Sequence, residues 1–367
     1  MKTFYQEYRL FFIILTILII GFLLWYFSNI VAYILVAVVV SILGQPIINL
    51  LEKIKFGKFR LPHALSALIS LLALLGILTA FFIFFIPLAV KEATLLSSID
   101  TKALLDHYKD NLNWLQSQLS KFGVLPKHMT LTDFLSVKIK SLVSLATFSN
   151  LLGNFLTVTG GLLFSIFSIL FLSFFFLNDE NLFLKILLAI MPEKYDEQTR
   201  NVTAKSRALL SRYFIGLFVD VILMIISYII GLTIIGVKGA VIIGIFGGIV
   251  NIIPYIGPII AALTGILLGA TSVIAAGDYT TLGPIILKIV TVFVTVIILD
   301  NFLYGPFIYG KSVHAHPVEI FIVIIAAGSI AGILGMIIAV PVYSLLRILA
   351  KEFLSQFRLV QKMTDKI

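Results

Sequence analysis

The sequence predicts an all-α polytopic membrane protein with about eight membrane segments, two of them broken or re-entrant, and one extramembrane helical insertion. Of the residues, 60% are hydrophobic and only 12% are charged, which is more apolar surface than a soluble domain can bury. Apolar runs recur along the whole chain, and basic residues gather beside them. The net charge of +9 therefore indicates membrane orientation rather than nucleic-acid binding.

Membrane helices are expected wherever an apolar run covers a hydrocarbon core of about 30 Å, which takes about 20 helical residues. These runs are Leu10–Phe27, Ile30–Leu51, Ala64–Val90, Leu151–Leu177, Tyr213–Ile235 and Leu282–Leu303. The first run follows basic residues, as a signal peptide would, but no small-residue cleavage site comes after it. We therefore expect it to be a retained first helix.

Two further apolar runs have the wrong length for one straight span. Gly239–Ala276 contains no charged residue and, as one helix, would be nearly twice as long as a bilayer core. It must break where Pro254 and Pro258 remove backbone donors. Ile320–Leu346 is interrupted by several glycines and by Pro341. Each run is predicted to be a re-entrant hairpin or a pair of short helices.

The short loops set the expected orientation. Glu52–His63 carries a cluster of basic residues against one acid, which predicts a cytoplasmic position. Counting forward, Lys91–Asn150 falls outside and Asn178–Arg212 inside. The basic C-terminal tail comes out inside if both anomalous runs return to the side they entered from. We expect a multi-pass membrane protein with both termini in the cytoplasm.

The chain is accordingly divided into consecutive segments. They are N-terminal membrane helices (1–90), an outer helical insertion (91–150), a membrane helix (151–177), a cytoplasmic connector (178–212), a C-terminal membrane transport core (213–350) and a cytoplasmic tail (351–367). The insertion carries a short heptad-like stripe made of Leu105, Tyr108, Leu112, Leu115, Leu119 and Phe122. It predicts an amphipathic helix lying on its own domain or on the bilayer, with a subunit contact or a lid as alternatives.

Several kinds of chemistry are disfavoured by the residues present. The chain has no cysteine, which excludes disulfides and thiolate metal sites. Gly305–Ser312 satisfies the phosphate-loop pattern, but it follows an apolar run rather than a strand of a soluble α/β domain, so we interpret it as a membrane-edge loop. His314 and His316 cannot share a helical face, which favours a loop pair, with His316 and Pro317 beginning the last membrane segment. No metal, cofactor or enzymatic activity is expected.

Two acidic residues fall inside predicted membrane helices, where a charge is costly and needs a partner. Asp220 lies within Tyr213–Ile235, and Asp300 lies near the end of Leu282–Leu303, followed by Asn301. Each aspartate is either a structural hydrogen-bond or ion-pair partner or a proton or cation site of a coupled transporter. Both are candidates for ion coupling, and Asn301 is a candidate gate residue with the His316–Pro317 pair.

Polar groups at a helix break are tolerated in lipid only where they are buried in protein or line a wet cavity. Paired Gly/Pro-interrupted segments also point to transporter binding sites. The two anomalous runs are therefore expected to face each other across a pathway, with hinges at glycine. The candidate pathway residues are Asn251, Pro254, Tyr255, Gly257, Pro258, Gly332, Gly335 and Pro341.

Short motifs in the second half of the chain are specific in their order, spacing and membrane context. They are Asn251–Pro258 with the pattern I-P-Y-x-G-P, Asp300-Asn301 before Pro306, Gly310-Lys311-Ser312, His316-Pro317, Gly332–Gly335 and Ala339–Pro341. In these residues the chain resembles the autoinducer-2 exporter family of bacterial membrane proteins. The resemblance covers nearly the whole length and is strongest from Tyr213 onward, although Asp220 stands where relatives often carry neutral residues.

The resemblance implies roughly eight membrane segments, a soluble insertion after the third, both termini inside, and homo-oligomers. It also implies export of autoinducer-2 or exchange of sodium or lithium for protons. We therefore expect a secondary transporter that exports a small polar solute of the autoinducer-2 kind, with the lipid bilayer and a small-molecule or cation substrate as partners. Na⁺(Li⁺)/H⁺ antiport is the alternative. Other classes are a membrane scaffold without transport and an intramembrane hydrolase, which requires Asp220 and Asp300 within hydrogen-bonding reach.

Overall fold

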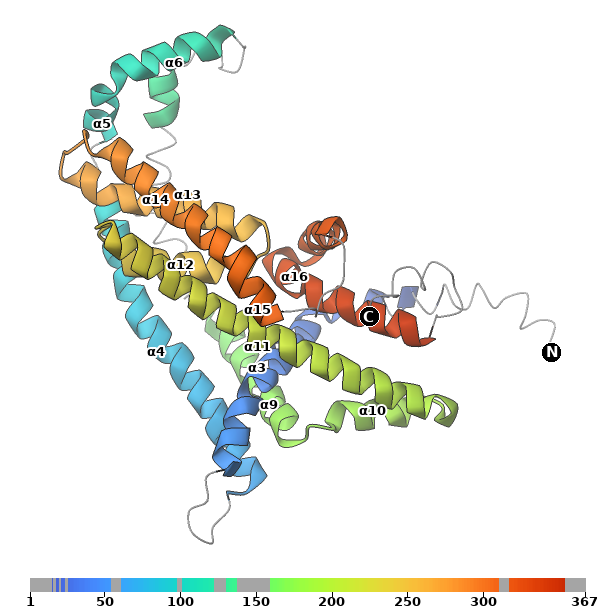
Figure 1. The fold of residues 1–367 in the computed structure, drawn as a ribbon. Coiled ribbons are helices and arrows are strands. Elements are labelled where there is room, and N and C mark those ends of the chain that lie inside the picture. The colour runs from blue at the N-terminus through green and yellow to red at the C-terminus, as the bar shows by residue number, and fades with distance from the viewer. Residues whose placement is uncertain are drawn as a thin grey trace. The chain divides into compact units, whose positions relative to one another are not determined.

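The computed structural model describes residues 15, 18–19, 21–23, 26–53, 61–97, 101–121, 130–136, 159–309 and 317–353. Within these ranges the regular elements are helices and no strand occurs (Figure 1). Six of the helices in this part of the chain are long and apolar enough to cross a membrane, and a seventh span would be a bent helix pair. The predicted all-α polytopic fold is confirmed, while the predicted span Leu10–Phe27 lies largely outside the described residues.

Large apolar side chains cover the outer surfaces of these helices. Phe307 is 88% exposed, Ile234 79% and Phe84 73%. In water, such an extended apolar surface would drive association or aggregation. Surrounded by lipid tails it is solvated, so the exposed residues support a bilayer as the surroundings of the helices.

The chain forms two compact units. The first consists of Met1–Ile77 and Val158–Asp196, and the second of Leu78–Thr157 and Glu197–Ile367. The helix α4 (His63–Ser97) contributes residues to both. The finer division of the chain given above, with boundaries at 90, 150, 177, 212 and 350, stays a prediction.

In the first unit, α3 (Ser28–Lys53) packs along α9 (Thr159–Asn178). Their contact with the first part of α4 is made by a small apolar core of Ile48, Ala67, Leu71 and Leu177. One buried polar group of this unit is bonded across two helices, since the Ser70 hydroxyl of α4 donates to the Gly44 carbonyl of α3 at 2.8 Å. At the end of α9 the chain bends by 88° into α10 (Leu182–Ile190).

The second unit holds the element order that positions the candidate site. Its helices are α11 (Asp196–Ile234), α12 (Ala240–Val250), α13 (Ile256–Ala275), α14 (Leu282–Leu299), the π-helix η2 (Asp300–Tyr304), α15 (Gly305–Tyr309) and α16 (Pro317–Phe353). Buried apolar residues of α11 to α14 form one core, against which Phe85, Leu88 and Ala89 of α4 also pack. The α11 helix begins well before the predicted span at Tyr213, because the mixed-charge connector continues the helix without a break.

The run Gly239–Ala276 folds as a helical hairpin, in agreement with the predicted break. Helices α12 and α13 pack against each other and are antiparallel, because Gly265 lies against Ile243 while Gly257 lies against Val250. Helix α12 spans 11 residues, or about 16 Å, which covers about half of a bilayer core.

The last apolar run is also a hairpin. The helical path of α16 is interrupted at Ala331 and Gly332, where Gly332 has φ +58° and ψ −143°, a conformation that is essentially restricted to glycine. Beyond this turn the second arm folds back on the first, since the Tyr343 hydroxyl donates to Glu319 Oε2 at 2.9 Å. Ile324 of the first arm packs against the second arm. Both runs that were too long for one span are thus broken.

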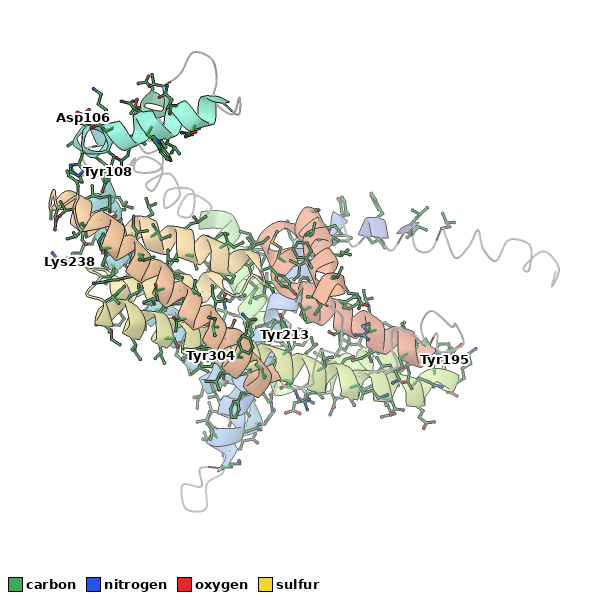
Figure 2. The ribbon with its side chains drawn as sticks, turned by 45° about the horizontal axis from the view of Figure 1, so that its top comes forward. Asp106, Tyr108, Tyr195, Tyr213, Lys238 and Tyr304 are labelled. Carbon is green, nitrogen blue, oxygen red and sulfur yellow. The ribbon has the colours of Figure 1, made fainter. Side chains whose placement is uncertain are left out.

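The predicted outer insertion contains α5 (Thr101–His107) and α6 (Lys109–Lys121), which belong to the second unit. Tyr108 lies beside the loop between α13 and α14 (Figure 2), and its hydroxyl donates to the Tyr279 carbonyl at 2.8 Å. The His107 ring lies 4.9 Å from the Tyr279 ring. Along α6, Trp114 is exposed and Leu112 is partly buried. The predicted lid and subunit-contact roles of this stripe stay predictions.

Candidate functional site

The two intramembrane aspartates meet in the second unit. Asp220 lies on α11, Asp300 begins η2 at the end of α14, and Asn251 follows the last residue of α12. The Asp300 side chain lies within hydrogen-bonding reach of both Asp220 and Asn251. Asp220 is only 6% exposed. We call these three residues the Asp–Asn–Asp site.

This arrangement restricts the charge that the site can hold. Two ionised carboxylates in contact repel each other strongly, so a hydrogen bond between them requires that they share a proton. A bound cation would satisfy them in the same way. The Asn251 amide can donate to Asp300, and its Oδ1 is buried and accepts no hydrogen bond from the described residues. The site thus offers oxygen ligands only, which suit a proton or a hard cation.

The turn of the first hairpin is tight and strained. Ile253 N donates to the Val250 carbonyl at 3.1 Å, and Ile256 N donates to the Pro254 carbonyl at 2.8 Å. The second bond closes a three-residue γ-turn around Tyr255, which has φ +65° and ψ −45°. This backbone conformation is rare and costs a non-glycine residue about 1–3 kcal/mol. The strain lies four residues from Asn251, next to the polar groups of the site.

Close backbone packing holds the same turn together. A Cβ added at Gly257 would lie 2.3 Å from the Val250 carbonyl oxygen and 2.9 Å from Asn251 Cα. No side chain other than hydrogen fits there. The I-P-Y-x-G-P pattern is therefore explained by the turn, with prolines that release backbone bonds at positions 254 and 258 and a glycine where two backbones touch.

The π-helix η2 begins at Asp300 itself. Single π-helical turns widen a helix by one residue and occur often at functional sites. Asn301 is exposed, and its side-chain amide donates to the Ile297 carbonyl of the same helix at 2.8 Å. Asn301 is therefore not brought into the Asp–Asn–Asp site by any bond that it makes here. Its candidate partner His316 lies outside the described residues, and Pro317 is the first residue of α16.

The predicted pathway residues of the last run shape the second hairpin. Gly332 forms its turn, and a Cβ at Gly335 would lie 2.1 Å from the Ala327 carbonyl oxygen, so the two arms touch there. Pro341 lies within the second arm. The two hairpins meet at the edge-to-face contact of the Tyr255 and Phe321 rings, whose centroids lie 5.6 Å apart. The expectation that the two broken runs face each other is thus consistent with one observed contact, and their role in a pathway stays a proposal.

Three hydroxyl residues near the aspartates were not predicted. The Ser227 hydroxyl and the Tyr304 hydroxyl are hydrogen-bonded at 2.8 Å, and Tyr304 ends η2 (Figure 2). Tyr228 is fully buried in the core of the unit. A signal for two of them exists in the sequence, because Ser227 and Tyr228 follow Asp220 by about two helical turns and so share its face of α11.

Elsewhere in the second unit, a shallow groove runs between α4 and the start of α12. It is lined by Leu88, Lys91, Glu92, Gly239 and Val241, among others. Glu92 is 9% exposed, and its carboxylate approaches the backbone at Gly239, which precedes α12. This close approach places the end of α4 beside the start of the first hairpin. Within the described ranges, no group of three or more His, Cys, Asp or Glu residues is placed to hold a metal ion.

Helices of membrane length, two helical hairpins and a pair of carboxylates, one buried and one half-buried, beside a hairpin turn define a polytopic α-helical membrane protein of the transporter class. Comparison with known families agrees with this class. The chain belongs to the AI-2E family of transporters, which it matches over residues 12–355. The resemblance of the short motifs is confirmed.

Individual relatives carry names that refer to transport. The chain is 32% identical over 196 residues to the "Putative transport protein YueF" of Bacillus subtilis, a match that covers 53% of this chain and 50% of the relative. It is 22% identical over 349 residues to a "Putative transport protein" of Thermotoga maritima, covering 95% of this chain and 96% of that protein. The match to the Bacillus subtilis relative thus spans about half of its length.

Proposed function

We propose that this protein is a secondary transporter that exports a small polar solute, of the autoinducer-2 kind, across the bacterial cytoplasmic membrane and couples its movement to protonation of the Asp–Asn–Asp site. The observation that carries the proposal is the contact between Asp220 and Asp300 at the turn of a membrane hairpin. A shared proton neutralises part of this charge, and its release creates a site for a cation. The aspartate pair can therefore exchange a proton for a cation.

The helix ends around the site favour the same chemistry. The C-terminal end of α12 lies at Asn251, and the negative end of its helix dipole favours a cation there. Broken helices in transporters use their half-helix ends in this way. The strained γ-turn at Tyr255 supplies a segment whose conformation can change at small cost once the packing around it loosens.

Na⁺(Li⁺)/H⁺ antiport is the second candidate function. The specific observation in its favour is the ligand set, which consists of carboxylate and amide oxygens only. In this case the cation is itself the cargo. The two candidates differ in whether a solute crosses the membrane together with the exchange.

The test is reconstitution of the full chain into liposomes, with autoinducer-2 efflux and sodium-driven proton flux measured side by side. Asp220→Asn and Asp300→Asn are each expected to lower coupled flux at least about tenfold, because an amide cannot exchange a proton or balance a cation. Asp278→Asn, which changes an exposed aspartate in the loop between α13 and α14, is the matched control and should retain wild-type flux. Wild-type flux in both site variants would refute ion coupling at this site.

The alternatives of other classes make different predictions. The contact between Asp220 and Asp300 meets the geometric condition for an intramembrane hydrolase, whereas the family of the chain is a family of transporters, which favours transport. A hydrolase would cleave a membrane substrate as purified protein without any gradient. A scaffold would show no flux with either probe in folded protein and would assemble through the segment 95–149. Retained flux after deletion of that segment would count against its heptad-like stripe as the main function, and unchanged assembly would count against the scaffold.

Orientation and assembly are part of the proposal. We expect both termini in the cytoplasm and a homo-oligomer. Because the natural chain has no cysteine, single cysteines can be introduced in 54–60 and in 354–367 and labelled from either side of intact cells with a membrane-impermeant thiol reagent. Labelling of both positions only after permeabilisation supports the orientation. A monomeric mass of the detergent-solubilised and the liposome-embedded protein would contradict the oligomer.

A further inference from the structure

The hydroxyl of Tyr228 is a buried polar group without a hydrogen-bond partner among the described residues. The side chain is 0% exposed, and its Oη makes no hydrogen bond to the described residues. A buried hydroxyl without a partner costs roughly 1–3 kcal/mol relative to one that is bonded. Phenylalanine would fill the same volume without this cost. Packing alone therefore does not explain why position 228 carries tyrosine rather than phenylalanine.

Packing fixes the direction of the Tyr228 side chain. Its ring lies against α12 at Gly247, where an added Cβ would be 3.3 Å from Cδ2. It also packs on Phe293 of α14, with ring centroids 4.5 Å apart and planes tilted by 32°. The ring is thus held between two helices and cannot swing to another rotamer without moving one of them.

The fixed ring brings the hydroxyl close to the Asp–Asn–Asp site. The Asp300 carboxylate is near enough to act electrostatically on the Tyr228 hydroxyl. Gly247, which contacts the ring, lies one helical turn before Asn251 on the same face of α12. Asn251 Oδ1 is a second buried oxygen without a hydrogen-bond partner among the described residues. Two buried oxygens without a partner among the described residues therefore belong to the surroundings of Asp300.

The titratable groups around this point are few. Helix α11 contributes Asp220 and Tyr228, and η2 contributes Asp300 and Tyr304, whose hydroxyl is bonded to Ser227. Apolar residues of α4, α12 and α13 pack against the core that contains Tyr228. Within the described chain, the Tyr228 hydroxyl is thus a hydrogen-bond donor that can turn to Asp300 when the aspartate pair loses its shared proton.

We propose that Tyr228 is a fourth member of the site, a positioning residue whose hydroxyl donates a hydrogen bond to the ionised Asp300 carboxylate and so sets the pH at which the site releases its proton. In the state seen here the pair is closed on itself and the hydroxyl is unused. When the proton leaves to water, the carboxylate gains acceptor capacity and the hydroxyl gains its partner. A hydrogen bond to the ionised form stabilises that form. This inference rests on the proposed coupling role of the aspartates.

The experiment compares Tyr228→Phe with wild type in the liposome assay over a range of pH. Phenylalanine keeps the ring between α12 and α14 but cannot donate, so the ionised pair is less stable and the proton is held to higher pH. The pH midpoint of flux should rise by about one unit, the size expected for one hydrogen bond to a charged group, while the maximal flux is retained. Tyr213→Phe, at a tyrosine on α11 that packs against the α16 hairpin, is the matched control and should leave the midpoint unchanged.

A second measurement does not depend on flux. The infrared carbonyl band of the protonated carboxyl, assigned by its loss in Asp300→Asn, should disappear at a pH about one unit higher in Tyr228→Phe than in wild type. Equal midpoints in both measurements would overturn the inference, and so would a loss of maximal flux at every pH with an unchanged midpoint. If wild-type protein shows no coupled flux although the band titrates and shifts, the proposed transport function fails while the role of Tyr228 stands.

Discussion

The turn of the first hairpin depends on Gly257, and its replacement gives the sharpest test of the fold around the site. In Gly257→Ala the new Cβ would lie 2.3 Å from the Val250 carbonyl oxygen, whereas ordinary contact begins near 3.4 Å. The two helices must separate there by the difference, about 1.1 Å. Both nearest atoms belong to the backbone, so no side-chain rotation can relieve the overlap.

The expected cost follows from this geometry. Overpacking a well-packed site costs typically 1–3 kcal/mol, and we expect the upper end, about 3 kcal/mol, because backbone must move. At 1.4 kcal/mol for each factor of ten, the hairpin would open roughly 100-fold more often. The same displacement carries Asn251 away from Asp300, and a misplacement of about 1 Å at a reacting group can lower a rate about 100-fold. Flux should therefore fall further than protein yield.

Thermal unfolding in detergent and flux in liposomes measure the two effects. Gly283→Ala is the matched control, because Gly283 lies in the first turn of α14 with nothing within 4 Å of the added Cβ. Alanine in a helix is favoured over glycine by about 0.5–1 kcal/mol, so this variant should be at least as stable as wild type. A Gly257→Ala protein with the unfolding temperature and flux of wild type would refute the argument from close packing.

Three other positions test local backbone and charge. At Tyr255, glycine should be more stable than alanine by about 1 kcal/mol or more, since only glycine removes the strain of φ +65°; equal unfolding temperatures would show that the turn is relaxed. Gly332→Ala should destabilise the α16 hairpin by about 1–3 kcal/mol through its φ of +58° alone, because nothing lies within 4 Å of the new Cβ; an unchanged unfolding temperature would contradict this. In the loop between α13 and α14, the hydroxyls of two following threonines hold the pKa of Asp278 below its usual range. A lowered pKa stabilises the loop at neutral pH and the effect is lost as pH falls below about 3.9, so amide exchange of the loop should accelerate there in wild type but not in Asp278→Asn.

The helix breaks are the features that the sequence predicts best. Pro254 and Pro258 indicated a break, and the break lies between α12 and α13. The interruption of the last run was also expected, but its turn at Gly332 was one of several glycine positions that could have served. The apolar run begins at Tyr213 whereas α11 begins at Asp196, because a mixed-charge segment can continue a membrane helix without any change in local backbone preference. The η2 π-helix has no pattern in the sequence that would have shown it.

The sequence by itself determined the class of protein, the positions of the breaks and the two costly aspartates. These follow from local quantities, namely the length of an apolar run against a bilayer, the missing donor of proline and the price of a charge in lipid. Only the tertiary structure decided that Asp220 and Asp300 meet at Asn251, that Tyr255 is strained and that the Tyr228 hydroxyl lies beside them. Which polar groups come together depends on how α11, α12 and α14 pack, and that packing is set by close contacts such as Gly257 on Val250 between segments that no local pattern aligns.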